Sequence, residues 1–73
     1  MKYDYGQAVR CKLLSETGVV LTKIASVVAI TPVENADQAE AFGVPIGTVI
    51  YQVEFGDGSD LLVPEQELDE VHG

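Results

Sequence analysis

The chain has 73 residues, of which 47% are hydrophobic, and it carries twelve Asp and Glu against four Lys and Arg, for a formal net charge of −8. This length fits one domain, residues 1–73, and the hydrophobic content excludes a disordered acidic tail. A pI near 4.2 opposes binding to nucleic acid, for which only a local patch of Arg10, Lys12 and Lys23 remains as a candidate surface.

The charges are divided along the chain. All four basic residues lie within the first 23 positions, whereas residues 34–73 hold ten carboxylates and no Lys or Arg. A surface that serves solubility alone usually mixes both signs. The division therefore favours an acidic face that attracts a basic protein, with solubility as the alternative.

Apolar side chains alternate with polar ones over 7–13, which predicts a first strand. Val9, Cys11 and Leu13 fall on one side of this strand, and Arg10 and Lys12 fall on the other, so its outer side is basic. Cys11 is the only cysteine. It is expected as a small core residue, and it cannot form an intrachain disulfide.

The next segment, 19–25, has no pattern that defines its conformation. Residues 26–31 are mostly apolar and β-branched, and they predict a buried second strand. Pro32 ends this strand, because proline lacks the N–H that a sheet requires.

A short helix is predicted at 36–42. Asn35 can cap it with Gln38 three residues later, and Gly43 ends it. A cap at Thr31, with Glu34 three residues later, is the alternative and would begin the helix one turn earlier.

The third strand, over 48–55, is the clearest element of the sequence, because four apolar side chains alternate there against Gln52 and Glu54. They are Val49, Tyr51, Val53 and Phe55. A turn at 56–58 then leads to a second β-prone run at 59–64, which together predict a hairpin.

The length of this turn decides the register of the hairpin. A two-residue turn aligns Val53 with Leu62, whereas a three-residue turn with Gly58 in a left-handed bulge aligns Val53 with Leu61 and Tyr51 with Val63. The second register is preferred because it buries two apolar residues, Leu61 and Val63, rather than one. It leaves Ile50 and Leu62 on the outer side.

The last elements are short. Residues 64–68 suit a single helical or 3₁₀ turn, and 69–71 can add a final strand to the sheet.

Five short strands, a one-turn helix before the last strand and the hairpin over 51–59 followed by 63–68 resemble small SH3-like barrels over nearly the whole chain. The expected fold class is thus mainly β: a small SH3-like barrel of about five antiparallel strands with a short helical insert between strands two and three. Among such barrels, the chain is most similar to the small immunity proteins of bacterial toxin systems, including the family called immunity protein 31. The resemblance implies a cytoplasmic protein that binds and blocks a cognate toxin domain.

Catalysis and metal binding find little support. The only histidine, His72, is the penultimate residue, where a mobile terminus is the simplest interpretation. Asp57, Asp60 and Glu65 are close in sequence, but their spacing does not match a calcium-binding loop. We therefore expect no enzymatic activity, no cofactor and no metal site.

The sequence thus favours a non-enzymatic module that binds a basic protein, such as a toxin domain, through its acidic half. The candidate protein-binding residues are Ile50, Glu54, Asp57, Asp60, Leu62, Glu65 and Glu67. The alternatives are a small structural or regulatory subunit of a larger bacterial complex and a homodimeric domain. Without a signal peptide or membrane-spanning segment, we expect a cytoplasmic monomer or homodimer with no membrane partner.

Overall fold

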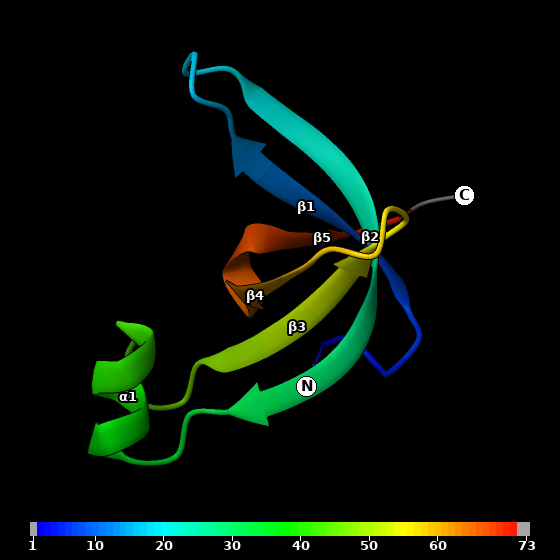
Figure 1. The fold of residues 1–73 in the computed structure, drawn as a ribbon. Helices are drawn as coiled ribbons and strands as arrows, with labels where there is room; N and C mark the ends of the chain where they lie inside the picture. Colours follow the sequence, from blue (N-terminus) through cyan, green and yellow to red (C-terminus); the bar gives the residue numbers. More distant parts are fainter. Residues whose placement is uncertain (1, 72–73) are drawn as a thin grey trace.

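The computed structural model describes residues 2–71, which form one strongly curved antiparallel sheet (Figure 1). The strand order is β4-β3-β2-β1-β5. The elements along the chain are β1 (Ala8–Leu14), β2 (Val20–Pro32), α1 (Ala36–Phe42), β3 (Val49–Phe55), β4 (Asp60–Pro64), the 3₁₀ turn η1 (Glu65–Glu67) and β5 (Leu68–Glu70). The mainly β fold of five antiparallel strands is confirmed, and so is the helix between the second and third strands.

The expected barrel is not observed, because the sheet of residues 2–71 is open. β4 and β5 lie at its two edges, and β5 pairs only with β1. β5 is three residues long, which is too short to pair far along any neighbour. The single turn η1 joins the two edge strands.

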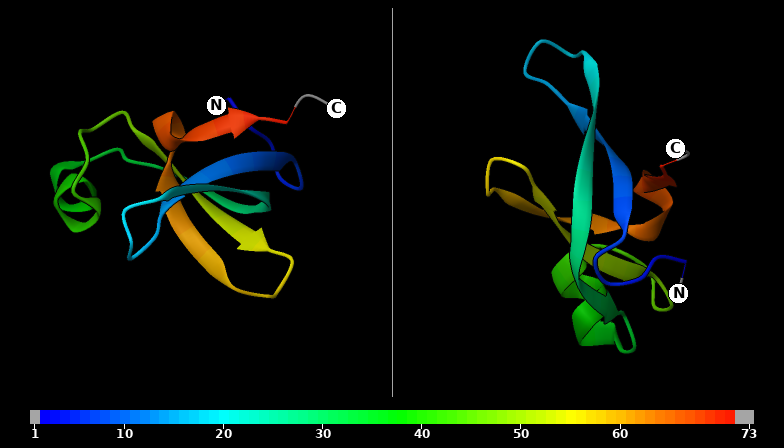
Figure 2. Two further views of the ribbon diagram at one scale, coloured as in Figure 1. Left: turned by 90° about the horizontal axis from the view of Figure 1, so that it is seen from above. Right: turned by 90° about the vertical axis from the view of Figure 1, so that its right-hand side faces the viewer.

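β2 belongs to both halves of the sheet. It pairs with β1 from Val20 to Ser26 and with β3 from Ala25 to Pro32. The two pairings therefore overlap at only two residues, and the first half of β2 projects with β1 as a two-stranded ribbon (Figure 2). The segment 19–25, which the sequence left open, is thus mostly strand.

A register shift in β2 lies between Val27 and Ala29, which marks a β-bulge at Val28. The bulge interrupts the burial predicted for 26–31: Val27 is buried, whereas Val28 is exposed. That prediction was too broad, because an inserted residue changes which side of a strand the following side chains occupy.

The β3–β4 hairpin has the predicted register. Val53 pairs with Leu61, Tyr51 pairs with Val63, and Gly58 has a φ of 87°. Val63 is buried as expected. Leu61 is instead exposed, because it lies at the turn end of the hairpin, next to the last pair Glu54–Asp60.

The helix also begins and ends where the sequence predicted. The Asn35 side chain accepts a hydrogen bond from the Gln38 amide at 2.9 Å, and Gly43 ends the helix with a φ of 68°. The alternative cap at Thr31 does not form, since Thr31 is paired with Ile50 inside the sheet.

The core lies on the concave side of the sheet. Its buried members are Tyr3, Val9, Cys11, Ala25, Val27, Tyr51, Val53, Val63 and Leu68. Cys11 is therefore the core residue that the sequence predicted. Tyr3 was not predicted, because it precedes the first strand and belongs to no alternating pattern.

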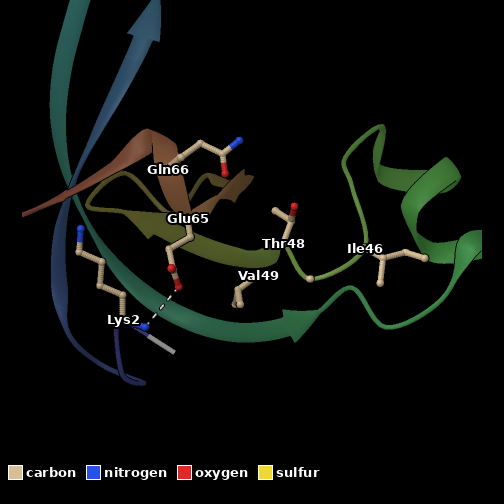
Figure 3. A pocket seen from close by; sticks show the side chains of 7 residues that line it. Lys2, Ile46, Thr48, Val49, Glu65 and Gln66 are labelled. Atoms are coloured by element: carbon tan, nitrogen blue, oxygen red, sulfur yellow. Dashed lines mark hydrogen bonds between the residues drawn. The ribbon is translucent and has the colours of Figure 1, made fainter.

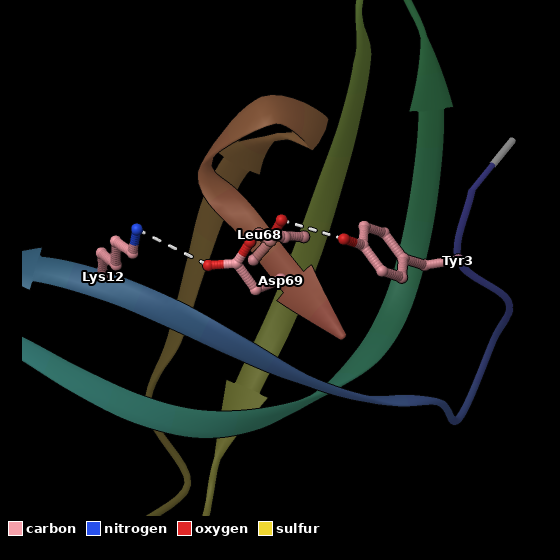
Figure 4. Close-up of polar contacts among 4 residues, drawn as sticks. All are labelled: Tyr3, Lys12, Leu68 and Asp69. Carbon is pink, nitrogen blue, oxygen red and sulfur yellow. Dashed lines mark hydrogen bonds and ion pairs between the residues drawn. The ribbon is translucent and has the colours of Figure 1, made fainter. Parts of the chain in front are cut away.

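Tyr3 ties the N-terminal segment to two other parts of the fold, β3 and β5. Its ring meets the ring of Tyr51 edge to face, with centroids 5.4 Å apart. Its hydroxyl donates to the Leu68 carbonyl at 2.9 Å (Figure 4), and its amide donates to the Tyr51 hydroxyl at 3.2 Å. These contacts join residues 48 and 65 positions apart in sequence.

We predict that Tyr3→Phe destabilises the fold by about 1 kcal/mol, because it removes one buried hydrogen bond and keeps the ring. Tyr3→Ala should cost about 3–5 kcal/mol, because it also leaves a cavity. Urea unfolding followed by circular dichroism measures both. Tyr5→Phe is the matched control, since Tyr5 is exposed. Equal stabilities of Tyr3→Phe and Tyr5→Phe would contradict the role given to the Tyr3 hydroxyl.

Candidate functional site

Four of the seven predicted binding residues gather on the β3–β4 hairpin. Glu54 of β3 lies directly opposite Asp60 of β4, and Leu62 lies opposite Gln52. Asp57 is in the turn between the two strands. We call Glu54, Asp57, Asp60 and Leu62 the acidic face; each of them is exposed.

The Glu54–Asp60 pair places two carboxylates at directly opposite positions of an antiparallel pair. Like charges in this arrangement destabilise a sheet. The side-chain amide of Gln52 donates to Asp60 at 3.1 Å, which offsets part of the repulsion. β3 and β4 contain no Lys or Arg, so no cation of these two strands neutralises the pair.

Asp57 remains charged under mildly acidic conditions. The Ser59 hydroxyl and the Ser59 amide both donate to its carboxylate, at 2.6 and 3.0 Å. These two hydrogen bonds lower the pKa of Asp57 below its ordinary value. The turn therefore presents a fixed negative charge beside Glu54 and Asp60.

The prediction that Ile50 is a protein-binding residue was wrong. Its side chain is only 3% exposed and is not available to a partner. It lies on the same side of β3 as Gln52 and Glu54, but at the opposite end of the strand. Here the segment 33–48, which carries α1, returns through a hydrogen bond from the Val33 amide to the Thr48 carbonyl at 2.8 Å. Alternation assigns a residue to one side of a strand, but it does not tell whether another segment covers that side.

Two residues of β2, rather than Ile50, are the exposed apolar side chains beside the acidic face. Ile24 and Val28 are exposed and lie with Glu54 around a shallow hollow of about 350 Å³. The complete lining is Ile24, Ala25, Ser26, Val28, Glu54, Phe55 and Gly56. The sequence analysis missed these two residues because the bulge that exposes Val28 has no clear sequence signal.

Glu65 lies apart from the acidic face, because it binds the hydroxyl of Tyr51, whose side chain points to the side of β3 opposite Glu54. The Tyr51 hydroxyl donates to the Glu65 carboxylate at 2.6 Å, and the backbone amide of Lys2 donates to the same oxygen at 3.2 Å (Figure 3). The hydrogen bond from Tyr51 lowers the pKa of Glu65. Burial, helped by Glu65, raises the pKa of Tyr51.

Glu65 also lines a second hollow, of about 400 Å³, between the N-terminal segment, η1 and the loop before β3 (Figure 3). The other lining residues are Lys2, Ile46, Gly47, Thr48, Val49 and Gln66. The only carboxylate of this lining already accepts two hydrogen bonds. The arrangement indicates a structural role for Glu65.

Glu67 is exposed on η1, also away from the acidic face. Asp69 of the neighbouring β5 faces basic residues: it pairs with Arg10 in the sheet and forms an ion pair with Lys12 at 3.6 Å (Figure 4). The basic outer side of β1 is thus matched by β5. Glu54 and Asp60 of the acidic face, in contrast, are paired with each other and not with a basic residue.

Across residues 2–71, no three His, Cys, Asp or Glu side chains come together as a group that could hold a metal ion. Cys11 is buried, and burial raises the pKa of its thiol. His72 lies outside the described residues.

No helix within residues 2–71 is long and apolar enough to cross a membrane. Comparison of the chain with protein-family models, with curated proteins and with solved structures finds no match.

The hydrogen bond from Tyr51 gives Glu65 a lower pKa in the folded chain than in the unfolded chain, so its ionised form stabilises the fold. This stabilisation is present above the ordinary value of 4.5 and is lost as the pH falls through the lowered pKa. We predict that Glu65→Gln is less stable than the wild type at pH 7 and that the difference narrows towards pH 3.

Urea unfolding at stepped pH measures this difference. Glu67→Gln, at an exposed position of the same turn, should follow the wild-type pH profile. A constant difference between Glu65→Gln and the wild type from pH 7 to pH 3 would contradict the prediction.

Proposed function

We propose that this chain is a non-enzymatic protein-binding module whose acidic face engages a basic surface of another protein. The observation that carries the proposal is the Glu54–Asp60 pair, two exposed carboxylates opposite each other on strands that contain no Lys or Arg. Because this pair costs stability in the free protein, a cation from a partner relieves repulsion as it binds. Solubility alone does not require this placement.

Apolar residues around the carboxylates support the proposal. Leu62 is 57% exposed beside Gln52, and Val28 is exposed beside Glu54. Binding surfaces commonly combine a few apolar anchors with a charged rim. In this arrangement, the apolar residues supply affinity, while the carboxylates steer association and select a basic partner.

The specific form that we favour is an immunity protein that neutralises a bacterial toxin in the cytoplasm. The five strands and the one-turn helix before the last strand support the likeness to SH3-like modules, in which case the open sheet is a variant of that barrel. A nuclease site must be basic to hold phosphate groups. If the partner is a nuclease, Glu54, Asp57 and Asp60 occupy the place of the nucleic-acid backbone.

We predict that Glu54→Lys/Asp60→Lys abolishes capture of the partner from lysate of the source organism and slows its association. Association of the wild type should slow as salt rises, because the Debye length falls from about 30 Å at 0.01 M to about 8 Å at 0.15 M. Surface plasmon resonance with the captured partner measures the rate at each salt concentration.

The matched control is Glu34→Lys/Glu40→Lys, two exposed carboxylates outside the acidic face. Each reversal adds two charges, so both double variants have the same net charge of −4 instead of −8. Equal loss of binding in the two variants would attribute the effect to net charge and contradict a local acidic face.

The immunity function has its own test. The captured protein, expressed alone, should arrest growth, and co-expression of the wild type should restore growth. Glu54→Lys/Asp60→Lys should fail to protect, and Glu34→Lys/Glu40→Lys should protect. A captured protein that is harmless when expressed alone would leave the binding module in place but exclude the immunity function.

A further inference from the structure

The first half of β2 is an exposed strand edge. β2 pairs with β3 only from Ala25 onward, so the segment Val20–Ile24 has β1 on one side and no paired strand on the other within residues 2–71. This segment lies in the ribbon that projects from the rest of the sheet (Figure 2). Such an edge is a ready template for pairing with another chain.

The direction of its free backbone groups follows from hydrogen bonds at the two ends of the ribbon. The Val27 amide donates to the backbone carbonyl of Gln7 at 3.0 Å, and the Ser15 amide donates to the backbone carbonyl of Val19 at 2.9 Å. Odd-numbered residues of β2 therefore bond to β1. In an antiparallel sheet the alternate residues point their N–H and C=O groups the other way, so those of Val20, Thr22 and Ile24 face outward.

The side chains of the same residues are exposed and mostly apolar. Val20 is 60% exposed, and Ile24 is 59% exposed. Both lie on the outer side of the ribbon with Thr22 between them. Leu21, on the other side, is also exposed. An edge with free backbone groups and exposed β-branched residues is suited to strand addition.

The geometry points to a second copy of this chain as the occupant, with the segment Val20–Ile24 of each copy paired antiparallel about a two-fold axis at Thr22. Val20 then lies opposite the partner's Ile24, and Thr22 lies opposite the partner's Thr22. The three residues whose backbone groups face outward are the three that this register pairs. Apolar side chains meet apolar ones, and threonine meets threonine, which is a favourable cross-strand pair.

The charge distribution favours the ribbon over other surfaces for contact between two copies. Each chain has a net charge of −8, which opposes self-association. Between Gln7 and Pro32, however, the only acidic residue is Glu16. The two strands of the ribbon therefore bring few carboxylates to the interface, and Glu54, which lies with Ile24 around the same hollow, is the neighbouring carboxylate from residues 34–73. Higher salt should strengthen this contact, whereas it weakens binding to a basic partner.

Lys23 does not block the edge. Its ammonium group lies over the ring of Phe55 of its own chain, 5.9 Å from the ring centroid, and thus leans back toward the sheet. Five residues at about 3.4 Å each give a contact about 17 Å long. A contact of this size is expected to be reversible and dependent on concentration.

Sedimentation equilibrium of the full chain at increasing concentration tests the proposal. The wild-type mass should rise from 7.8 kDa toward twice that value, and more readily in high salt. Val20→Lys/Ile24→Lys should stay at 7.8 kDa, because it places like charges opposite each other at both outer pairs. Val20→Lys/Ile24→Glu should restore the dimer, because the same register then pairs opposite charges.

Ile46→Lys is the matched control, since Ile46 is 59% exposed but lies in the loop before β3. It should dimerise like the wild type. A wild type that stays monomeric at every concentration would overturn the proposal, and so would a Val20→Lys/Ile24→Glu variant as monomeric as Val20→Lys/Ile24→Lys.

A second measurement does not depend on these charged variants. Thr22→Cys should form a disulfide-linked dimer in an oxidising glutathione buffer, because the two-fold axis brings both copies of position 22 together. Cys11 is buried and does not compete. Thr17→Cys, in the exposed turn of the same ribbon, is the control. Equal cross-linking of the two variants would refute the register.

Discussion

The fold depends on the length of β2 and on its division between two partners. Its thirteen residues pair first with β1 and then with β3. Because the two pairings overlap only at Ala25 and Ser26, the sheet has to bend around this strand. The bend creates the concave side that holds the core, and it leaves one end of the strand without a second neighbour. The acidic face and the projecting ribbon thus adjoin each other at the middle of β2, where Ile24 and Glu54 line the same hollow.

The core of so small a sheet also depends on buried hydrogen bonds, and two tyrosines provide them. Tyr3 fills the concave side, while its hydroxyl and the hydroxyl of Tyr51 connect the N-terminal segment to η1 and β5. Across residues 2–71, no buried side-chain nitrogen or oxygen lacks a hydrogen-bond partner. A buried polar group without a hydrogen-bond partner destabilises a fold. Because both tyrosine hydroxyls have partners, a 73-residue chain can bury two phenol rings. Glu65 takes part in this network, which explains why this half-buried carboxylate serves the fold rather than the acidic face.

Local patterns predicted the parts of the structure that local physics determines. The Asn35 cap, the left-handed Gly43 and Gly58, and the hairpin register each follow from a few adjacent residues. The features that escaped prediction depend on residues distant in sequence. Ile50 is buried where the segment carrying α1 returns, Val28 is exposed by a bulge, and Tyr3 packs against residues far along the chain. The same limit applies to the candidate site, since the charge of Glu54, Asp57 and Asp60 was readable from the sequence, whereas the separation of Glu65 from them was not.

Because Cys11 is buried, its reactivity can report the opening of the strands around it. It lies on β1 between Lys23 of β2 and Leu68 of β5, and its thiol faces the core. Burial raises the pKa of this thiol, so little of the reactive thiolate exists at neutral pH, and reagents cannot reach the thiol while the strands around it stay packed. Alkylation therefore has to wait until the layer formed by β1, β2 and β5 opens. The rate at which a small electrophile labels the native chain therefore reports the population of that open state, at the one cysteine and without any engineered probe.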